Sequence, residues 1–160
     1  MPTNRRNSTP MKKHLIAIVL FSAALQAQAG VDRFVQKINL PAGLTAVVAE
    51  GDFEARSIGS FTVRLYSAEH AQPGDDTTFF VGSIVRERDG SIERIELADI
   101  DGDDKPELIV TVRNAGTGQY LSAQAFGFDK KRVWLRAAVA DLAKDADPIA
   151  ALKKATLNKK

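Results

Sequence analysis

Carboxylates recur at alternate positions in one short loop of the sequence. In "DIDGDDKPE", residues 99–107, the acidic side chains at positions 1, 3, 5 and 9 of a calcium-loop-like spacing are Asp99, Asp101, Asp103 and Glu107. Oxygen ligands on alternate residues of a tight loop can converge on one hard cation such as Ca²⁺. Asp104 stands where such loops have glycine, and Val110 stands where they have a twelfth-position glutamate. The loop is therefore a candidate calcium site, and a polar turn with Asx hydrogen bonds is the alternative.

A second loop combines small residues with hydroxyl groups. In "RNAGTGQY", residues 113–120, Gly116 and Gly118 flank Thr117, and Tyr120 follows. The glycines keep the backbone narrow, threonine and tyrosine offer hydroxyl groups, and tyrosine is a frequent hot-spot residue of protein interfaces. Such a loop can enter a cleft in another protein and hydrogen-bond carboxylates there. The alternative is an ordinary glycine-rich hairpin loop.

The first 29 residues have the three parts of a secretory signal peptide. A basic start at Met11-Lys12-Lys13 precedes a short apolar run over 14–25, and Ala27-Gln28-Ala29 fits an A-x-A cleavage site. We expect Met11 to be the true start, cleavage after Ala29, and a mature periplasmic domain of residues 30–160. The leader carries four basic residues and no acid, so its removal changes the formal net charge from +2 to −2. A domain of this charge does not indicate nucleic acid or an anionic membrane as a partner.

The mature sequence offers little for covalent catalysis. It has no cysteine, and its one histidine is His70 in a polar loop, so a Ser-His-Asp triad would have to be built on that residue. Acidic residues are numerous but lie mostly in predicted turns, whereas a glycosidase needs two of them in one cleft at a set separation. We therefore expect no enzymatic activity. A hydrolase with a cleft near His70 is the third interpretation of the sequence.

The elements that must position these loops are short strands. Runs of β-branched and aromatic residues between turn signals predict about eight of them. They are expected at residues 33–40, 44–50, 60–67, 77–88, 91–99, 106–113, 119–128 and 132–139. Strand 106–113 is nearly continuous apolar and is expected to be central, imperfect alternation predicts a bulge in 91–99, and Asp89-Gly90 predicts a hairpin. Asp147 before Pro148 predicts the start of a helix.

These elements indicate an all-β fold in one domain. We expect an antiparallel β-sandwich of about eight strands, with an open barrel as the alternative, and a short C-terminal helix. A secreted domain without disulfides must rely on its hydrophobic core.

Four segments of the mature chain together resemble one family. They are similar to the periplasmic inhibitors of invertebrate-type (i-type) lysozyme from Gram-negative bacteria, and the resemblance covers nearly all of the mature chain. The segments are "AVVAEGDFEARSIGSFTVRLYS" (46–67), "ADIDGDDKPELIV" (98–110), "NAGTGQYLSAQAF" (114–126) and "LAKDADPIAAL" (142–152). The resemblance implies a β-sandwich that blocks the lysozyme's active cleft, often as a homodimer. It implies protection of peptidoglycan against host defence, and no cofactor.

The resemblance also implies roles for individual residues. The family's inhibitory loop carries a Ser-Gly-x-Tyr pattern, which falls here on Thr117, Gly118, Gln119 and Tyr120. Threonine departs from serine at the first position but keeps the hydroxyl group. Expected supports of the loop or contacts at its rim are Arg113, Asn114 and Gly116. Further candidates for a second contact surface are Arg56, Ser57, Ser60 and Tyr66. The alternative is that these four are ordinary exposed strand residues. A calcium-binding envelope module remains the alternative function.

Overall fold

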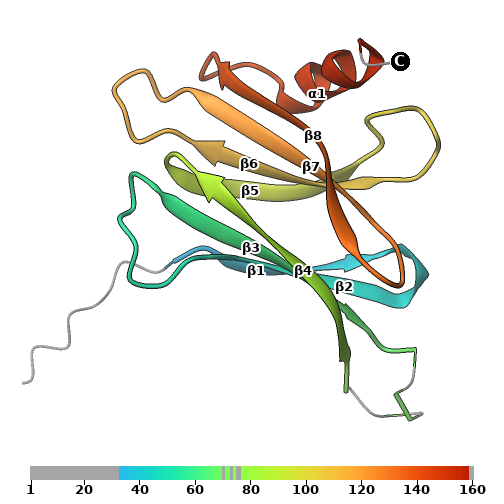
Figure 1. The fold of residues 1–160 in the computed structure, drawn as a ribbon. Coiled ribbons are helices and arrows are strands. Elements are labelled where there is room, and N and C mark those ends of the chain that lie inside the picture. Colours follow the sequence, from blue (N-terminus) through green and yellow to red (C-terminus); the bar gives the residue numbers. More distant parts are fainter. Residues whose placement is uncertain (1–32, 70, 73, 75–76, 159–160) are drawn as a thin grey trace, which may run out of the picture.

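The computed structural model describes residues 33–158, apart from residues 70, 73, 75 and 76. It contains two four-stranded antiparallel sheets and a C-terminal α-helix, α1 (Figure 1). This confirms the predicted all-β fold with about eight strands and a short C-terminal helix. The predicted leader and His70 lie outside the described residues. Within the described part of the chain, no helix has the length and apolar character needed to cross a membrane.

The first sheet is formed by the N-terminal half of the domain. Its strands, in spatial order, are β1 (Val35–Leu40), β2 (Leu44–Glu50), β3 (Gly59–Ser67) and β4 (Phe79–Arg88). A short 3₁₀ turn, Pro41–Gly43, joins β1 to β2. The predicted alternation in β3 is confirmed, because Phe61, Val63 and Leu65 are fully buried. These side chains form the first wall of the core between the sheets.

The second sheet is formed by the C-terminal half. Its strands, in spatial order, are β5 (Ser91–Ala98), β6 (Glu107–Arg113), β7 (Leu121–Phe128) and β8 (Val133–Leu142). β6 is buried along almost its whole length and lies between β5 and β7, as its apolar run predicts. The predicted irregularity in β5 is confirmed by a register shift between Ile92 and Arg94. Phe126 of β7 meets Phe61 of β3 edge to face across the core.

The prediction of a hairpin at Asp89-Gly90 is wrong. β4 pairs with β3 and β5 pairs with β6, so this two-residue connection carries the chain from one sheet to the other. Gly90 has a φ of +119° and lies against the Arg113 carbonyl group, where an added Cβ would collide with the backbone. Only glycine fits this sharp corner, and such corners are where chains switch between packed sheets.

The helix α1 (Pro148–Leu157) covers the outer face of the second sheet (Figure 1). As predicted, Asp147 caps it: its carboxylate accepts the N–H groups of Ile149 and Ala150 at 2.9 and 3.3 Å. Leu152 is fully buried against the small residues of β7 and β8. The second sheet is therefore covered on both faces, which explains why β6 lacks a polar side.

The strand register places the loops at two opposite ends of the sandwich. The connection β2–β3 (residues 51–58, here the Phe53 loop), the corner 89–90 and the connection β6–β7 (residues 114–120, here the tip loop) share one end (Figure 1). The connection β5–β6 (residues 99–106, here the acidic loop) lies at the other end. Two segments that the sequence marks as candidate sites are thus far apart.

Candidate functional site

The tip loop is closed by its own backbone. The Asn114 N–H group donates to the Tyr120 carbonyl oxygen at 2.9 Å, which continues the ladder between β6 and β7 beyond the strands. Above it, the Gln119 N–H group donates to the Gly116 carbonyl oxygen at 3.0 Å. Thr117 and Gly118 are the two central residues of this turn. The loop is therefore a defined hairpin whose tip points away from the sandwich.

Arg113 and Asn114 brace the base of this loop. Arg113 Nη1 donates to the carbonyl oxygens of Gln119 at 3.1 Å and Lys144 at 3.3 Å, and its Nε forms an ion pair with Glu93. The Arg113 guanidinium, by its hydrogen bond, holds the pKa of Glu93 below its usual range. Asn114 accepts the Gly116 N–H group through Oδ1 at 2.5 Å and donates from Nδ2 to Asp89 at 2.8 Å. Two of the three predicted supporting residues, Arg113 and Asn114, thus contact the framework of the loop, and the third, Gly116, is bound by Asn114.

Gly118 leaves space for the Tyr120 ring. A Cβ added at Gly118 would lie 2.9 Å from Cδ2 and 3.0 Å from Cζ of Tyr120, closer than packed carbon atoms come. The positive φ in this loop belongs to Gln119, at +47°, and not to either glycine. Gly118 is therefore required for the position of the aromatic ring rather than for backbone freedom. Tyr120 remains 53% exposed, and Thr117 is exposed.

A depression of about 410 Å³ opens beside Tyr120, between β4 and β8. Ile58 and Gly59 border it on one side and Asn114 and Tyr120 on the other. Part of its wall is a polar link between the two sheets, in which Arg86 Nε donates to Gln124 Oε1 at 2.8 Å. The tip loop thus lines one side of this depression.

The structure separates the candidates for a second contact surface. Arg56 and Ser57 are exposed in the Phe53 loop, at the same end as the tip loop. Ser60 follows them, but its hydroxyl group donates to Glu54 Oε1 at 2.7 Å and is therefore used within the loop. Tyr66 lies at the opposite end of β3, where its ring packs edge to face with Phe80 at a centroid distance of 6.0 Å. Three of the four candidates are thus at the tip-loop end.

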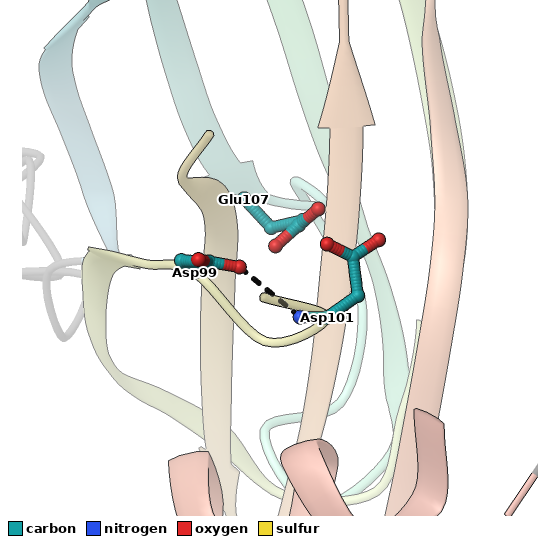
Figure 2. A group of neighbouring side chains, drawn as sticks. All are labelled: Asp99, Asp101 and Glu107. Atoms are coloured by element: carbon teal, nitrogen blue, oxygen red, sulfur yellow. Dashed lines mark hydrogen bonds between the residues drawn. The ribbon is translucent and has the colours of Figure 1, made fainter. Parts of the chain in front are cut away.

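The carboxylates at the other end come together only in part. Asp99, Asp101 and Glu107 each place one oxygen within 4.8 Å of the others (Figure 2). Asp103, the fourth predicted ligand, is outside this group and instead accepts the Lys105 N–H group at 2.9 Å. Three carboxylates at this spacing have the chemistry to hold a hard cation.

Backbone groups and an arginine already engage these three carboxylates. Asp99 accepts the N–H groups of Asp101, Gly102 and Asp104 at 3.2, 2.8 and 3.1 Å. Asp101 forms an ion pair with Arg136. Glu107 accepts the Ile100 N–H group at 3.0 Å, and burial raises the pKa of its carboxyl group. These contacts match the alternative prediction of a turn closed by Asx hydrogen bonds.

Two residues near the tip loop were not predicted from the sequence. Phe53 is fully exposed in the Phe53 loop, and Arg88 is buried beneath it. An aromatic residue between the turn residues of "EGDFEARSIG" is a signal that could have drawn attention to Phe53. The role of Arg88 could not be read in this way, because its partners come from segments distant in the sequence.

Comparisons with known proteins agree with this arrangement. The sequence model of the family "periplasmic lysozyme inhibitor of I-type lysozyme" matches residues 32–156. A crystal structure of such an inhibitor from Aeromonas hydrophila is 42% identical and superposes with a TM-score of 0.66; the match covers 74% of this chain and 98% of that one. Comparison with curated proteins gives no match.

A second crystal structure shows an Aeromonas hydrophila inhibitor of this kind in complex with Meretrix lusoria lysozyme. It is 43% identical and also has a TM-score of 0.66; the match covers 75% of this chain and 95% of that one. The family consists of proteins that inhibit a lysozyme and not of enzymes. With nearly all of the described domain matched, the chain belongs to the family of periplasmic inhibitors of I-type lysozyme.

Proposed function

We propose that this protein inhibits an invertebrate-type lysozyme by inserting the tip loop into the active cleft of that enzyme. The observation that carries the proposal is the geometry of the loop. Its base is braced by Arg113 and Asn114, while Thr117 is exposed and Tyr120 is half exposed. This arrangement, on a chain of the inhibitor family, supports the assignment of Thr117, Gly118 and Tyr120 to the inhibitory contact.

The chemistry of the target explains why these groups suit the task. Glycosidases of the lysozyme kind work with two carboxyl groups, one acting as acid and one ionised, in a cleft that binds sugar hydroxyls. Thr117 and Tyr120 would offer hydroxyl groups to those carboxylates in place of the sugar. A peptide loop contains no glycosidic bond, so it occupies the cleft without being cleaved. Because its base is already ordered, little conformational entropy is lost on binding.

The compartment follows from the same function. We propose that the chain is exported, cleaved after Ala29, and protects peptidoglycan in the periplasm against host lysozyme. The three-part leader and the periplasmic family support this. Mass spectrometry of a periplasmic fraction should find a chain that begins at Gly30. A cytoplasmic chain that retains Met11 would contradict the proposal.

We also propose that the protein forms a homodimer. Support comes from the outward face of the edge strand β4, where Phe80 and Val85 are 61% and 62% exposed and lie opposite Tyr66 and Thr62 of β3. An exposed apolar edge strand is a common site of association between sheets. Analytical ultracentrifugation of the mature protein should give twice the monomer mass. A monomer at micromolar concentration would contradict this assignment.

The calcium-binding alternative has one observation in its favour, the three carboxylates of Asp99, Asp101 and Glu107 within 4.8 Å. Arg136 already supplies a positive charge to Asp101, and backbone N–H groups occupy Asp99. We therefore propose that the acidic loop mainly shapes a turn.

One assay tests the main proposal. Peptidoglycan suspensions lose turbidity when lysozyme acts on them, and the purified mature protein is added to lysozymes of the invertebrate, chicken and goose types. We expect inhibition of the invertebrate type. Unchanged clearing by that enzyme at micromolar inhibitor would contradict the proposed function.

A further inference from the structure

Phe53 has a backbone conformation that is rare for a bulky residue. Its φ is +61°, in the left-handed region, and its side chain is fully exposed. Bulky residues seldom adopt this conformation, and where the surrounding structure enforces it the site is often functional. The ring contributes no burial within the described part of the chain. Its presentation therefore needs an explanation outside the domain.

The backbone that follows Phe53 is held by a buried arginine. Arg88, at the end of β4, has a side chain with no solvent exposure. It donates to the carbonyl oxygens of Ala55 at 3.1 Å, Arg56 at 2.9 Å and Ser60 at 3.0 Å. Arginine has five donors and is rarely buried unless they are satisfied. The Phe53 loop is thus fixed from below.

Glu54 holds the loop from the side. Its carboxylate accepts the Ser60 N–H group at 2.5 Å and the Ser60 hydroxyl group at 2.7 Å, and these bonds lower its pKa. Gly51 leaves room for this carboxylate, since an added Cβ there would lie 2.5 Å from Glu54 Cδ. Arg33 donates to the Glu54 carbonyl oxygen. Arg88 and Glu54 thus hold the backbone of the loop that presents Phe53 by hydrogen bonds on two sides.

The Phe53 loop and the tip loop are tied to the same corner of the sandwich. Arg88 donates to the Gly90 carbonyl oxygen, and Asn114 donates to the Asp89 carboxylate at 2.8 Å. Ile58, also 66% exposed, and Tyr120 border the same depression of about 410 Å³. Ile58 of the Phe53 loop and Tyr120 of the tip loop therefore line one depression at the same end of the sandwich, and hydrogen bonds join both loops to the corner between the sheets.

We propose that the Phe53 loop is a second lysozyme-contacting element, in which Phe53 is an apolar anchor and Arg88 is the residue that positions it. This rests on the proposed inhibition of an invertebrate-type lysozyme. While the tip loop enters the cleft, the lip of the cleft occupies this depression, and the Phe53 ring packs against the outer side of that lip. Rigid aromatic side chains give large contact area at low entropic cost, which suits such an anchor.

The test compares two exposed phenylalanines at opposite ends of the first sheet. Phe53→Ala and Phe53→Asn remove the anchor, and Phe79→Ala is the matched control. Asparagine tolerates positive φ better than phenylalanine, so the melting temperature of Phe53→Asn should not fall. Both Phe53 variants should weaken inhibition of the invertebrate-type lysozyme about tenfold, mainly through faster dissociation. Phe79→Ala should stay within about twofold of the wild type.

Parallel measurements keep the outcomes distinct. One outcome is that Tyr120→Ala inhibits much more weakly than the wild type while both Phe53 variants inhibit like the wild type. The tip loop is then the inhibitory element, and the proposed second contact is wrong. If Phe53→Asn changes the mass measured by light scattering while inhibition is unchanged, Phe53 contacts a second copy and the proposal is also wrong. If the wild type inhibits no invertebrate-type lysozyme, the proposed function and this contact both fail.

Discussion

The acidic loop and the tip loop are of similar length and lie at opposite ends of the sandwich, yet they use their polar groups in opposite ways. In the acidic loop, the Asp99 carboxylate accepts three backbone N–H groups and the Asp101 carboxylate pairs with Arg136. In the tip loop, hydrogen bonding is concentrated at the base, on Arg113 and Asn114. The carboxylates of the acidic loop are therefore used within the domain, whereas in the tip loop only the base is hydrogen-bonded and the side chains at the tip are exposed.

Composition alone does not distinguish a structural loop from a binding loop. Both loops contain glycine and several polar side chains. What separates them is whether the polar side chains are used by the chain's own backbone. Among the described residues, no hydrogen-bond partner is found for the Thr117 or Tyr120 hydroxyl group, whereas Asp99 and Glu107 bind backbone N–H groups. The two hydroxyl groups can therefore bind a partner protein without losing an internal hydrogen bond.

The strongest test of this comparison is Tyr120→Ala. An aromatic hot spot contributes about 2 kcal/mol or more, so inhibition of invertebrate-type lysozyme should weaken roughly thirtyfold or more. The melting temperature should change little, because the ring is half exposed. Phe79→Ala, an exposed aromatic residue at the opposite end of the sandwich, is the matched control and should leave the inhibition constant unchanged. Equal inhibition by folded Tyr120→Ala and wild type would show that the tip loop is only a hairpin.

Gly118→Val should have the next largest effect. The added side chain would occupy the space of the Tyr120 ring and displace it, so we expect inhibition to weaken about tenfold. Gly118→Ala adds only the Cβ and should fall between this variant and the wild type. The inhibition constants of the two variants are compared with that of Tyr120→Ala. The comparison shows how much of the loss of inhibition is caused by displacement of the Tyr120 ring. A Gly118→Val variant as inhibitory as the wild type would rule out the close packing of ring and glycine in the bound state.

Glu93→Gln tests the brace below the loop. The pair of Glu93 and Arg113 is partly exposed, so its loss should weaken inhibition by less than about fivefold. Because the pKa of Glu93 is lowered in the fold, its contribution to stability is present above the unfolded pKa and is lost as the pH falls through the folded pKa. The wild-type melting temperature should therefore fall in that acidic range more than the variant's does. Identical pH profiles of the two proteins would contradict this role.

Thr117 distinguishes the hydroxyl group from the methyl group at the tip. Thr117→Ser keeps the hydroxyl and should remain within about twofold of the wild type, whereas Thr117→Ala should weaken inhibition more, though less than Tyr120→Ala. Inhibition constants for the pair, measured together, separate the two contributions. If serine were as harmful as alanine, the methyl group and not the hydroxyl would make the contact.

The acidic loop should have the smallest effect on inhibition. We expect full inhibition in excess EDTA and in Glu107→Gln. Burial raises the pKa of Glu107, so stability falls as the pH rises through the folded pKa, and Glu107→Gln should raise the melting temperature at neutral pH. Calcium added to the wild type should not change its melting temperature. Loss of inhibition in EDTA that calcium restores would instead identify a cation site.

Much of this fold follows from local patterns in the sequence. Alternation in β3 marks Phe61, Val63 and Leu65 as core residues, and a continuous apolar run marks β6 as covered on both faces. Asp147 before Pro148 marks the start of α1, because capping depends on neighbouring residues alone. The tip loop could also be singled out, since its glycines, hydroxyl groups and the family pattern are contiguous. Each of these signals depends on residues close together in the chain.

Other features depend on which strands pair, and only the tertiary structure decides them. Asp89-Gly90 has the composition of a hairpin, but pairing of β4 with β3 and of β5 with β6 makes it a corner between sheets. Arg88 is buried because carbonyl groups of a distant loop surround it, and Tyr66 is remote from the tip loop because β3 spans the sandwich. Arg136 reaches Asp101 from β8. Residues that contact each other across 30 or more positions produce no periodic pattern in the sequence. Local sequence therefore predicts where the loops lie, whereas the pairing of distant strands determines which residues surround each loop.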